Sequence, residues 1–214
     1  MQGPTISIIV PIYGVEKYIR QCADTVLGQT YPNIQFIFVN DGTKDNSMQV
    51  LDELIREVLG EKLLTPAEMM GDYPSLRAMR EADGWLPLSD CAGRVVVLLH
   101  DTTVTKDYIS QDETIKSQAM FPMLRYKDRD KDYASFLIVN KPKDIDKYSQ
   151  ELIFEKKLVI RTRVDSYGSY NEEDRILTLE SGAQILSTDY PPKADMTEVE
   201  YVVGFDKGTA RDIK

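Results

Sequence analysis

Residues 34–47, IQFIFVNDGTKDNS, place an apolar run directly before a short polar loop. Beyond this loop, apolar residues recur at helical spacing, as at Met48, Leu51 and Leu54. A buried parallel strand that ends in polar residues and is followed by a helix is how open α/β sheets build ligand sites. Asp41, at the end of the run, is therefore the first candidate for a binding residue.

The residues before this stretch complete a strand–helix–strand unit. Residues 5–13, TISIIVPIY, form a second apolar run rich in β-branched side chains, and Gly14 ends it. Between residues 15 and 29, apolar side chains return at helical spacing, which predicts a helix. The first quarter of the chain therefore reads as α/β.

The segment PIYGVEKYIRQCADTVLGQTYPNIQFIFVNDGTKDNS, residues 11–47, resembles the amino terminus of family 2 glycosyltransferases. The resemblance implies the nucleotide-sugar-binding GT-A fold, with Pro11, Tyr13 and Asp41 against the nucleotide and Asp41 accepting the imide N–H of the base. Gly14 stands where that family usually has Asn. The alternative is that Asp41 only caps the loop before the next helix.

Composition narrows the classes of partner. The chain has 214 residues, 42% hydrophobic and 29% charged, as in a soluble globular protein. A net charge of −9 argues against a nucleic-acid surface and against adsorption to anionic lipid. We see no signal peptide and no apolar run long enough to span a bilayer, so the expected location is cytoplasmic.

After residue 60, apolar runs alternate with helical stretches, which predicts further parallel strands with covering helices. Thr65, Pro66 and Glu68 form a capping-box signal for a short helix. The predicted strands cover 95–99, 120–124, 134–139, 158–160, 184–187 and 199–205, and the predicted helices 105–118, 143–156 and 171–181.

A second resemblance rests on residues 51–85 and on GRVVVLLHD (93–101), LVIRTRVDSYG (158–168) and SGAQILSTDYP (181–191). These blocks are similar to the carboxyl-terminal half of bacterial calcium-dependent phosphoinositide phospholipase C, which implies half of a TIM-type barrel. The predicted fold class is thus α/β: a Rossmann-like βαβ unit of GT-A type, residues 1–58, joined to a partial barrel, residues 59–214.

The phospholipase resemblance implies a reaction with two histidines and Ca²⁺. The sequence contains one histidine, His100, at the end of an apolar run. We therefore expect impaired turnover, and we interpret His100 as a rim residue or a catalytic candidate.

The substrate side of that site is retained in the sequence. Its residues are Arg161, Arg163, Asp165, Asp189 and Tyr190, which follow two predicted strands. Arginines two residues apart point to one side of a strand, and guanidinium groups suit phosphate. The alternative is an ion-paired barrel mouth, with Arg163 beside Asp165 or Asp189.

A glycosyltransferase also needs a divalent metal, Mn²⁺ or Mg²⁺, which the family holds with an Asp-x-Asp motif. Asp101 is the metal and catalytic candidate, but Thr103 replaces the second acid. Asp128, Asp130 and Asp132 are more typical of a solvated loop.

Three functions follow from these observations. The first is nucleotide-sugar binding by a glycosyltransferase-like segment. The second is a phospholipase C-like phosphoric diester hydrolase that recognises a phosphorylated polyol, and the third is a fusion without turnover. The open sheet edges leave two alternatives, a barrel-like closed sheet or a homodimer that covers the edges.

Overall fold

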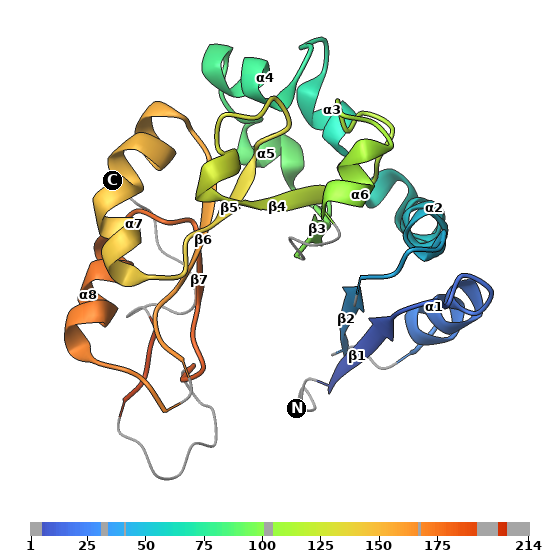
Figure 1. Cartoon of the computed structure of the whole chain (residues 1–214), viewed down its shortest axis with the longest axis horizontal. Helices are drawn as coiled ribbons and strands as arrows, with labels where there is room; N and C mark the ends of the chain where they lie inside the picture. Colours follow the sequence, from blue (N-terminus) through green and yellow to red (C-terminus); the bar gives the residue numbers. More distant parts are fainter. Residues whose placement is uncertain are drawn as a thin grey trace. The chain divides into compact units, whose positions relative to one another are not determined.

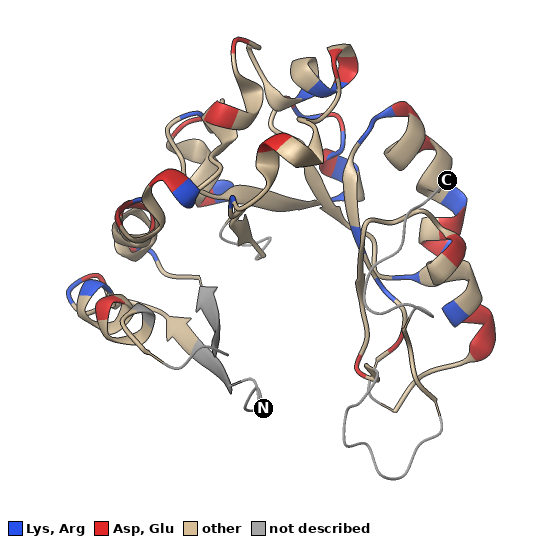
Figure 2. Ribbon diagram, turned by 180° about the vertical axis from the view of Figure 1, so that it is seen from behind, with Lys and Arg blue, Asp and Glu red and all other residues tan. Residues whose placement is uncertain are grey.

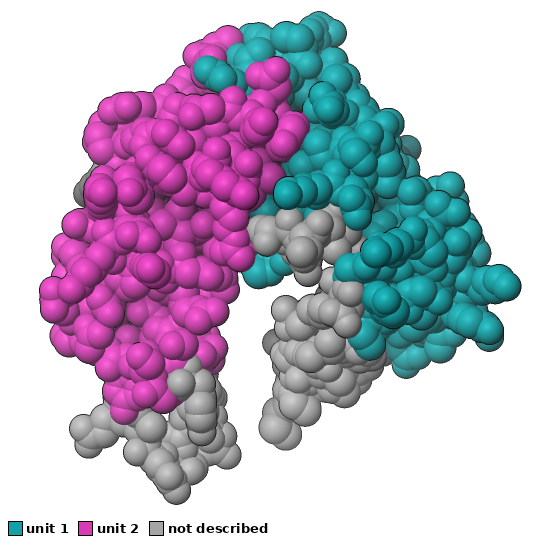
Figure 3. Space-filling model, in the orientation of Figure 1, with its two compact units in different colours: residues 1–79, 85–123 teal, residues 80–84, 124–214 magenta. Residues whose placement is uncertain are grey.

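The computed structural model describes residues 6–30, 34–40, 42–100, 105–166, 168–191 and 201–204. The chain divides into two compact units, shown in Figure 3. Unit 1 comprises residues 1–79 and 85–123, and unit 2 comprises residues 80–84 and 124–214.

The amino-terminal unit of strands and helices forms as the sequence predicts. The strands β1 (Ile6–Ile12) and β2 (Ile34–Asn40) flank α1 (Ile19–Leu27), and α2 (Ser47–Leu59) follows. The two strands pair in parallel with Ile6 opposite Ile34 and Ile12 opposite Asn40 (Figure 1). This parallel register brings the loops that follow β1 and β2 to the same end of the pair.

The remaining elements of unit 1 are mostly short. They are a 3₁₀ turn (Gly60–Lys62), α3 (Pro66–Met70), α4 (Leu76–Ala82), which continues into unit 2, α5 (Leu88–Cys91), β3 (Leu98–Leu99), α6 (Thr105–Ser110) and β4 (Phe121–Arg125), whose last two residues belong to unit 2. Strand β3 pairs in parallel with β4. The predicted capping box is confirmed, because Thr65 and Glu68 each bond the other's backbone N–H.

One hydrophobic core joins the two segments whose sequences resemble different families. Ile12 and Ile19 pack in the same buried cluster as Met48 and Leu51 of α2 and Tyr108 of α6. A polar contact lies beside this cluster, where the Asp52 carboxylate accepts hydrogen bonds from the Tyr108 hydroxyl and, at 2.8 Å, from the Ala119 backbone N–H. Burial raises the pKa of Tyr108, and the charge of Asp52 raises it further. The phenol is therefore a fixed donor.

Unit 2 contains the parallel strands β5 (Phe136–Ile138), β6 (Val159–Arg163) and β7 (Ile185–Ser187). Its helices are a 3₁₀ turn (Tyr126–Asp128), α7 (Pro142–Ser149), a π-helical turn (Gln150–Glu155) and α8 (Glu172–Glu180). The strands β3 to β7 follow one another in the sheet order β3-β4-β5-β6-β7. In Figure 1, α7 and α8 lie beside β6 and β7, as expected for parallel strands with covering helices.

Three predicted elements differ from the structure, and one of them, the strand predicted over 95–99, is a strand only at Leu98–Leu99. The helix predicted over 105–118 ends at Ser110, because the Asp112 carboxylate accepts hydrogen bonds from the backbone N–H groups of Thr114, at 2.9 Å, and Ser117, at 2.8 Å. The strand predicted over 199–205 is wrong for residues 201–204, the part that the structure describes. There the Val203 backbone N–H donates to the Tyr190 carbonyl at 2.8 Å.

Candidate functional site

The loop that follows β2 in unit 1 is fastened by Asp45. One carboxylate oxygen of Asp45 accepts from the hydroxyls of Thr43, at 2.6 Å, and Ser47, at 2.5 Å. The other oxygen accepts from the backbone N–H of Glu16 at 3.0 Å. The Thr43 hydroxyl also accepts from the Gly14 backbone N–H at 2.8 Å, so the loops after β1 and β2 are tied together.

These bonds stabilise the charged form of Asp45. The Ser47 and Thr43 hydroxyls hold the pKa of the Asp45 carboxyl well below its usual range, although partial burial opposes them. With its acceptor sites occupied, Asp45 serves to position the loops. The sequence interpretation missed this role, although an acid flanked by Thr43 and Ser47 is a typical side-chain-bonded turn.

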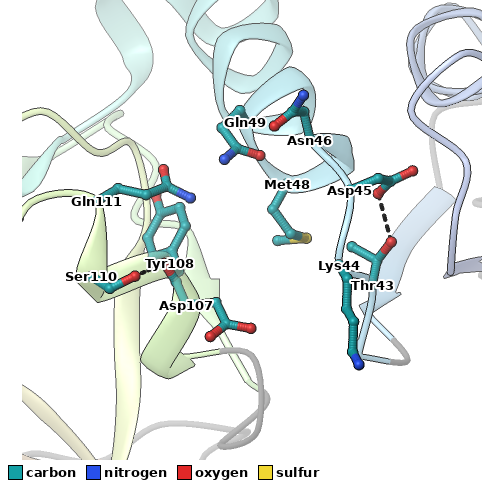
Figure 4. Close-up of a pocket in the computed structure, with 10 residues that line it drawn as sticks. All are labelled: Thr43, Lys44, Asp45, Asn46, Met48, Gln49, Asp107, Tyr108, Ser110 and Gln111. Carbon is teal, nitrogen blue, oxygen red and sulfur yellow. Dashed lines mark hydrogen bonds between the residues drawn. The ribbon is translucent and has the colours of Figure 1, made fainter.

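A cavity of about 320 Å³ lies in unit 1 beside this loop (Figure 4). Its lining comes from the loop and start of α2 and from α6: Thr43, Lys44, Asp45, Asn46, Met48, Gln49, Asp107, Tyr108, Ser110 and Gln111. Met48 points into its centre, and Lys44 and Asp107 lie on opposite sides. The lining of the cavity is thus polar and carries both positive and negative side chains. It comes from both segments that resemble known families.

The predicted residues of the nucleotide site are only partly described. Pro11 lies in β1 and is exposed, and Tyr13 follows that strand with 67% of its surface exposed. His100 is exposed directly after β3. Asp41 and Asp101 lie outside the described residues. Nucleotide binding by Pro11, Tyr13 and Asp41 therefore stays a prediction.

In unit 2, the predicted arginines lie at the end of β6. Arg161 is half-buried, and its guanidinium donates to the Asn140 side-chain oxygen at 2.6 Å. Arg163 is exposed two residues further along the strand. Burial lowers the pKa of Arg161, and the positive charges of Arg163 and Arg125 lower it further. Positive charge is therefore concentrated at this point.

The acids of the predicted rim make other bonds. The buried Asp165 carboxylate accepts from the Thr188 hydroxyl at 2.6 Å and from the Asp189 backbone N–H at 2.7 Å. Within the described ranges, the structure records no ion pair of Arg161 or Arg163 with Asp165 or Asp189. The charge of Asp189 raises the pKa of Arg161, but burial and the two neighbouring arginines outweigh it. The bonds of Asp165 thus come from uncharged donors, and the ion-paired mouth stays a prediction.

Tyr190 belongs to an aromatic cluster next to Asp165. Its ring lies edge-on to Tyr170 and Tyr201, with centroids 4.9 and 5.3 Å away, and its hydroxyl accepts from the Gly168 backbone N–H at 2.9 Å. Burial raises the pKa of Tyr201 to about 12, and the charge of Asp165 adds to this shift. Tyr190, 3% exposed, is therefore a packing residue of this cluster.

A divalent metal would need several oxygen ligands at one point of the structure. Calcium takes about six to eight oxygen ligands. Among the residues that the structure describes, no three side chains of His, Cys, Asp or Glu gather as a metal site. That described donor set does not fit Ca²⁺, Mn²⁺ or Mg²⁺.

Parallel strands alternating with helices, with charged side chains at the carboxyl ends of the strands, define an α/β protein of the TIM-barrel type. Residues 31–213 match the family model "Phosphoinositide phospholipase C, Ca2+-dependent". The chain belongs to this family.

Two solved structures show the same fold. They are the calcium-dependent phosphoinositol-specific phospholipase C from Pseudomonas sp. (TM-score 0.54, 17% identity, 81% of this chain and 64% of that one) and the enzyme from Streptomyces antibioticus (TM-score 0.50, 13% identity, 86% and 64%). The partial TIM-barrel-like fold predicted from the sequence is thereby confirmed.

Over a short stretch the chain is also similar to glycosyltransferases. It is 48% identical over 48 residues to glycosyltransferase GlyA of Streptococcus pneumoniae, and 48% identical over 50 residues to the uncharacterized glycosyltransferase EpsJ of Bacillus subtilis. These matches cover 22% and 23% of the chain but only 7% and 14% of those proteins. Both predicted resemblances are therefore present, with unequal extent.

Proposed function

We propose that this protein binds a phosphorylated polyol, such as an inositol phosphate, at the end of β6, and that it hydrolyses phosphodiesters poorly or not at all. The observation that carries the proposal is the state of Arg161. Its half-buried guanidinium is repelled by two other arginines and, among the described residues, bonds only Asn140. A guanidinium in this state favours a bound anion, and its planar fork matches phosphate.

Poor turnover follows from the inventory of acid–base groups. The phospholipase resemblance implies two histidines, and the chain has one. Loss of a general acid or base costs about 10²- to 10⁴-fold each. The poor fit of the described acids to Ca²⁺ supports the same conclusion.

Calorimetry with myo-inositol 1-phosphate tests binding. Replacing Arg161 by Gln removes a charge-assisted contact of about 1.5–3 kcal/mol, so we expect an affinity loss of about 10- to 100-fold. The matched control is Arg175→Gln in α8, because Arg175 is paired with Glu172 at 2.6 Å. Equal affinity of Arg161→Gln and wild type, or no heat for wild type, would reject the proposal.

Hydrolysis of phosphatidylinositol in Ca²⁺ tests the second part. We expect phosphatidylinositol to be hydrolysed no faster than in buffer without the protein. Robust turnover that disappears in His100→Ala would show that one histidine suffices.

The amino-terminal segment supports a second function, binding of a nucleotide sugar by Pro11, Tyr13 and Asp41. The observation in its favour is that Asp45 and Thr43 tie the loops after β1 and β2 together, next to a polar cavity. Titration of UDP and UDP-sugars with and without Mn²⁺ tests it. Asp41→Asn should weaken binding, whereas Asp24→Asn, on the exposed side of α1, should not.

A further inference from the structure

The residues around Arg161 define its ligand more narrowly than a polyol phosphate. In the parallel register, Arg161 lies opposite Ile138 of β5 and Ile185 of β7, and Arg163 lies opposite Ser187. The alternate positions Ile160 and Thr162 are fully buried, so the two arginines share the other face of β6. The neighbours of Arg161 across the strands are thus apolar and offer it no counter-charge.

A third arginine contributes to the same place. Arg125 is the last residue of β4, two strands from β6 in the sheet order. Neighbouring strands lie about 4.8 Å apart, so the backbones at Arg125 and β6 are roughly 10 Å apart across the sheet. Long arginine side chains reach over such a distance, and the charge of Arg125 does act on Arg161.

The carboxylates near this cluster do not balance it. Asp165 accepts from Thr188 and from the Asp189 backbone, and its charge acts on Tyr201. Of the two, Asp189 acts on Arg161 through its charge, but burial and the two other arginines outweigh it. Three arginines against the two acids Asp165 and Asp189 leave a surplus of positive charge, which favours an anionic ligand.

We propose that the arginine site, formed by Arg125, Asn140, Arg161 and Arg163, selects a dianionic phosphomonoester over a phosphodiester. This inference rests on the proposed binding function and adds the class of ligand. A phosphodiester carries one negative charge, whereas a phosphomonoester carries close to two near neutral pH. Asn140 holds the Arg161 fork through its side-chain oxygen, so the amide N–H₂ remains as a donor to the ligand.

The selectivity depends on pH through the ligand. The second pKa of a phosphomonoester is about 6. The other charged or titratable groups here are the arginines, which stay protonated, the acids Asp165 and Asp189, and Tyr201, whose pKa is raised to about 12. Between about pH 5 and 7.5 the phosphate is thus the group at this site that changes charge, and acid weakens the binding of the monoester alone.

Calorimetry on the full chain compares myo-inositol 1-phosphate with its methyl diester. Near pH 7.5 we expect the monoester to bind about tenfold tighter or more, and near pH 5 the two affinities to approach each other, since about nine-tenths of the monoester is then monoanionic. Arg125→Gln should reduce the ratio at pH 7.5, whereas Arg125→Lys should retain most of it.

The outcomes separate the two proposals. If both ligands bind with equal affinity at pH 7.5, or the diester binds tighter, the phosphomonoester inference is overturned and polyol-phosphate binding stands. If neither binds, both proposals fall. The matched control is Arg175→Gln. If Arg125→Gln leaves the ratio of monoester to diester affinity unchanged, as the control should, Arg125 does not belong to the site.

Discussion

The loop after β2 and the end of β6 both contain charged side chains, but the surroundings stabilise the charge in the loop and destabilise it at the end of β6. In the loop, Asp45 is surrounded by donors, and its charged form is stabilised. At the end of β6, Arg161 faces two like charges and has one described hydrogen-bond partner. The first arrangement stabilises the fold, whereas the second leaves like charges close together, which is the observation behind the proposed phosphate site.

Charge on the rest of the molecule does not show this contrast. Figure 2 shows basic and acidic residues mixed along the helices of both units. Such pairs contribute about 0–1 kcal/mol each. The two charge clusters therefore stand out by their bonding and not by their charge alone.

The largest expected effect is at the fully bonded acid. Asp45→Ala removes an acceptor of several hydrogen bonds and releases the loop after β1, so we expect unit 1 to lose about 3 kcal/mol. Urea unfolding followed by the fluorescence of Trp85, the single tryptophan, measures this because Trp85 belongs to unit 1. Asp24→Ala, on the exposed side of α1, is the control. If the free energy of unfolding falls as little as in the control, Asp45 does not stabilise these loops.

Acid should have the next largest effect. The pKa of Asp45 is lower in the folded state than in the unfolded chain, so its contribution is complete above the unfolded value of about 3.9 and disappears as pH falls through the folded value. Between about pH 6 and 3, the loss of this contribution should therefore cost unit 1 at most about 1.3 kcal/mol, since Asp45 is partly exposed. Urea midpoints at both pH values measure it. In Asp45→Asn the urea midpoint should differ less between the two pH values. An unchanged difference in that variant would mean that other acids cause the pH dependence.

The smallest effect should have the opposite sign. Arg161→Leu removes a half-buried charge that Arg163 and Arg125 repel, and leucine suits the apolar neighbours Ile138 and Ile185. We expect unit 2 to gain about 1 kcal/mol while phosphate binding is lost. Hydrogen exchange of peptides that cover β6 measures the gain. Faster exchange than in wild type would show that Arg161 stabilises the fold.

The sequence predicted much of the local structure because its signals are local. Apolar periodicity located β1, α1, β2 and α2, and the Thr65 capping box marked the start of α3. The end of α6 was missed because a side chain, Asp112, takes the backbone donors that would continue the helix.

The candidate site was predictable only in part. Spacing alone placed Arg161 and Arg163 on one face of a strand. Arg125 and Asn140 come from other strand ends, and only the order of the strands brings them to β6. Spacing also did not predict that the Thr188 hydroxyl and the Asp189 backbone bond Asp165.

No helix in the described part of the chain combines the length and apolar character that crossing a bilayer requires. The expected cytoplasmic location and homodimer stay predictions.

Helix α2 packs between two segments that resemble different proteins. Its apolar side contacts Ile12 and Ile19 from the segment similar to glycosyltransferases and Leu99 and Tyr108 from the segment similar to phospholipase C, so the two segments share a single interior. A cut at residue 58 would therefore expose apolar surface on both fragments, and neither fragment would keep the whole of this interior.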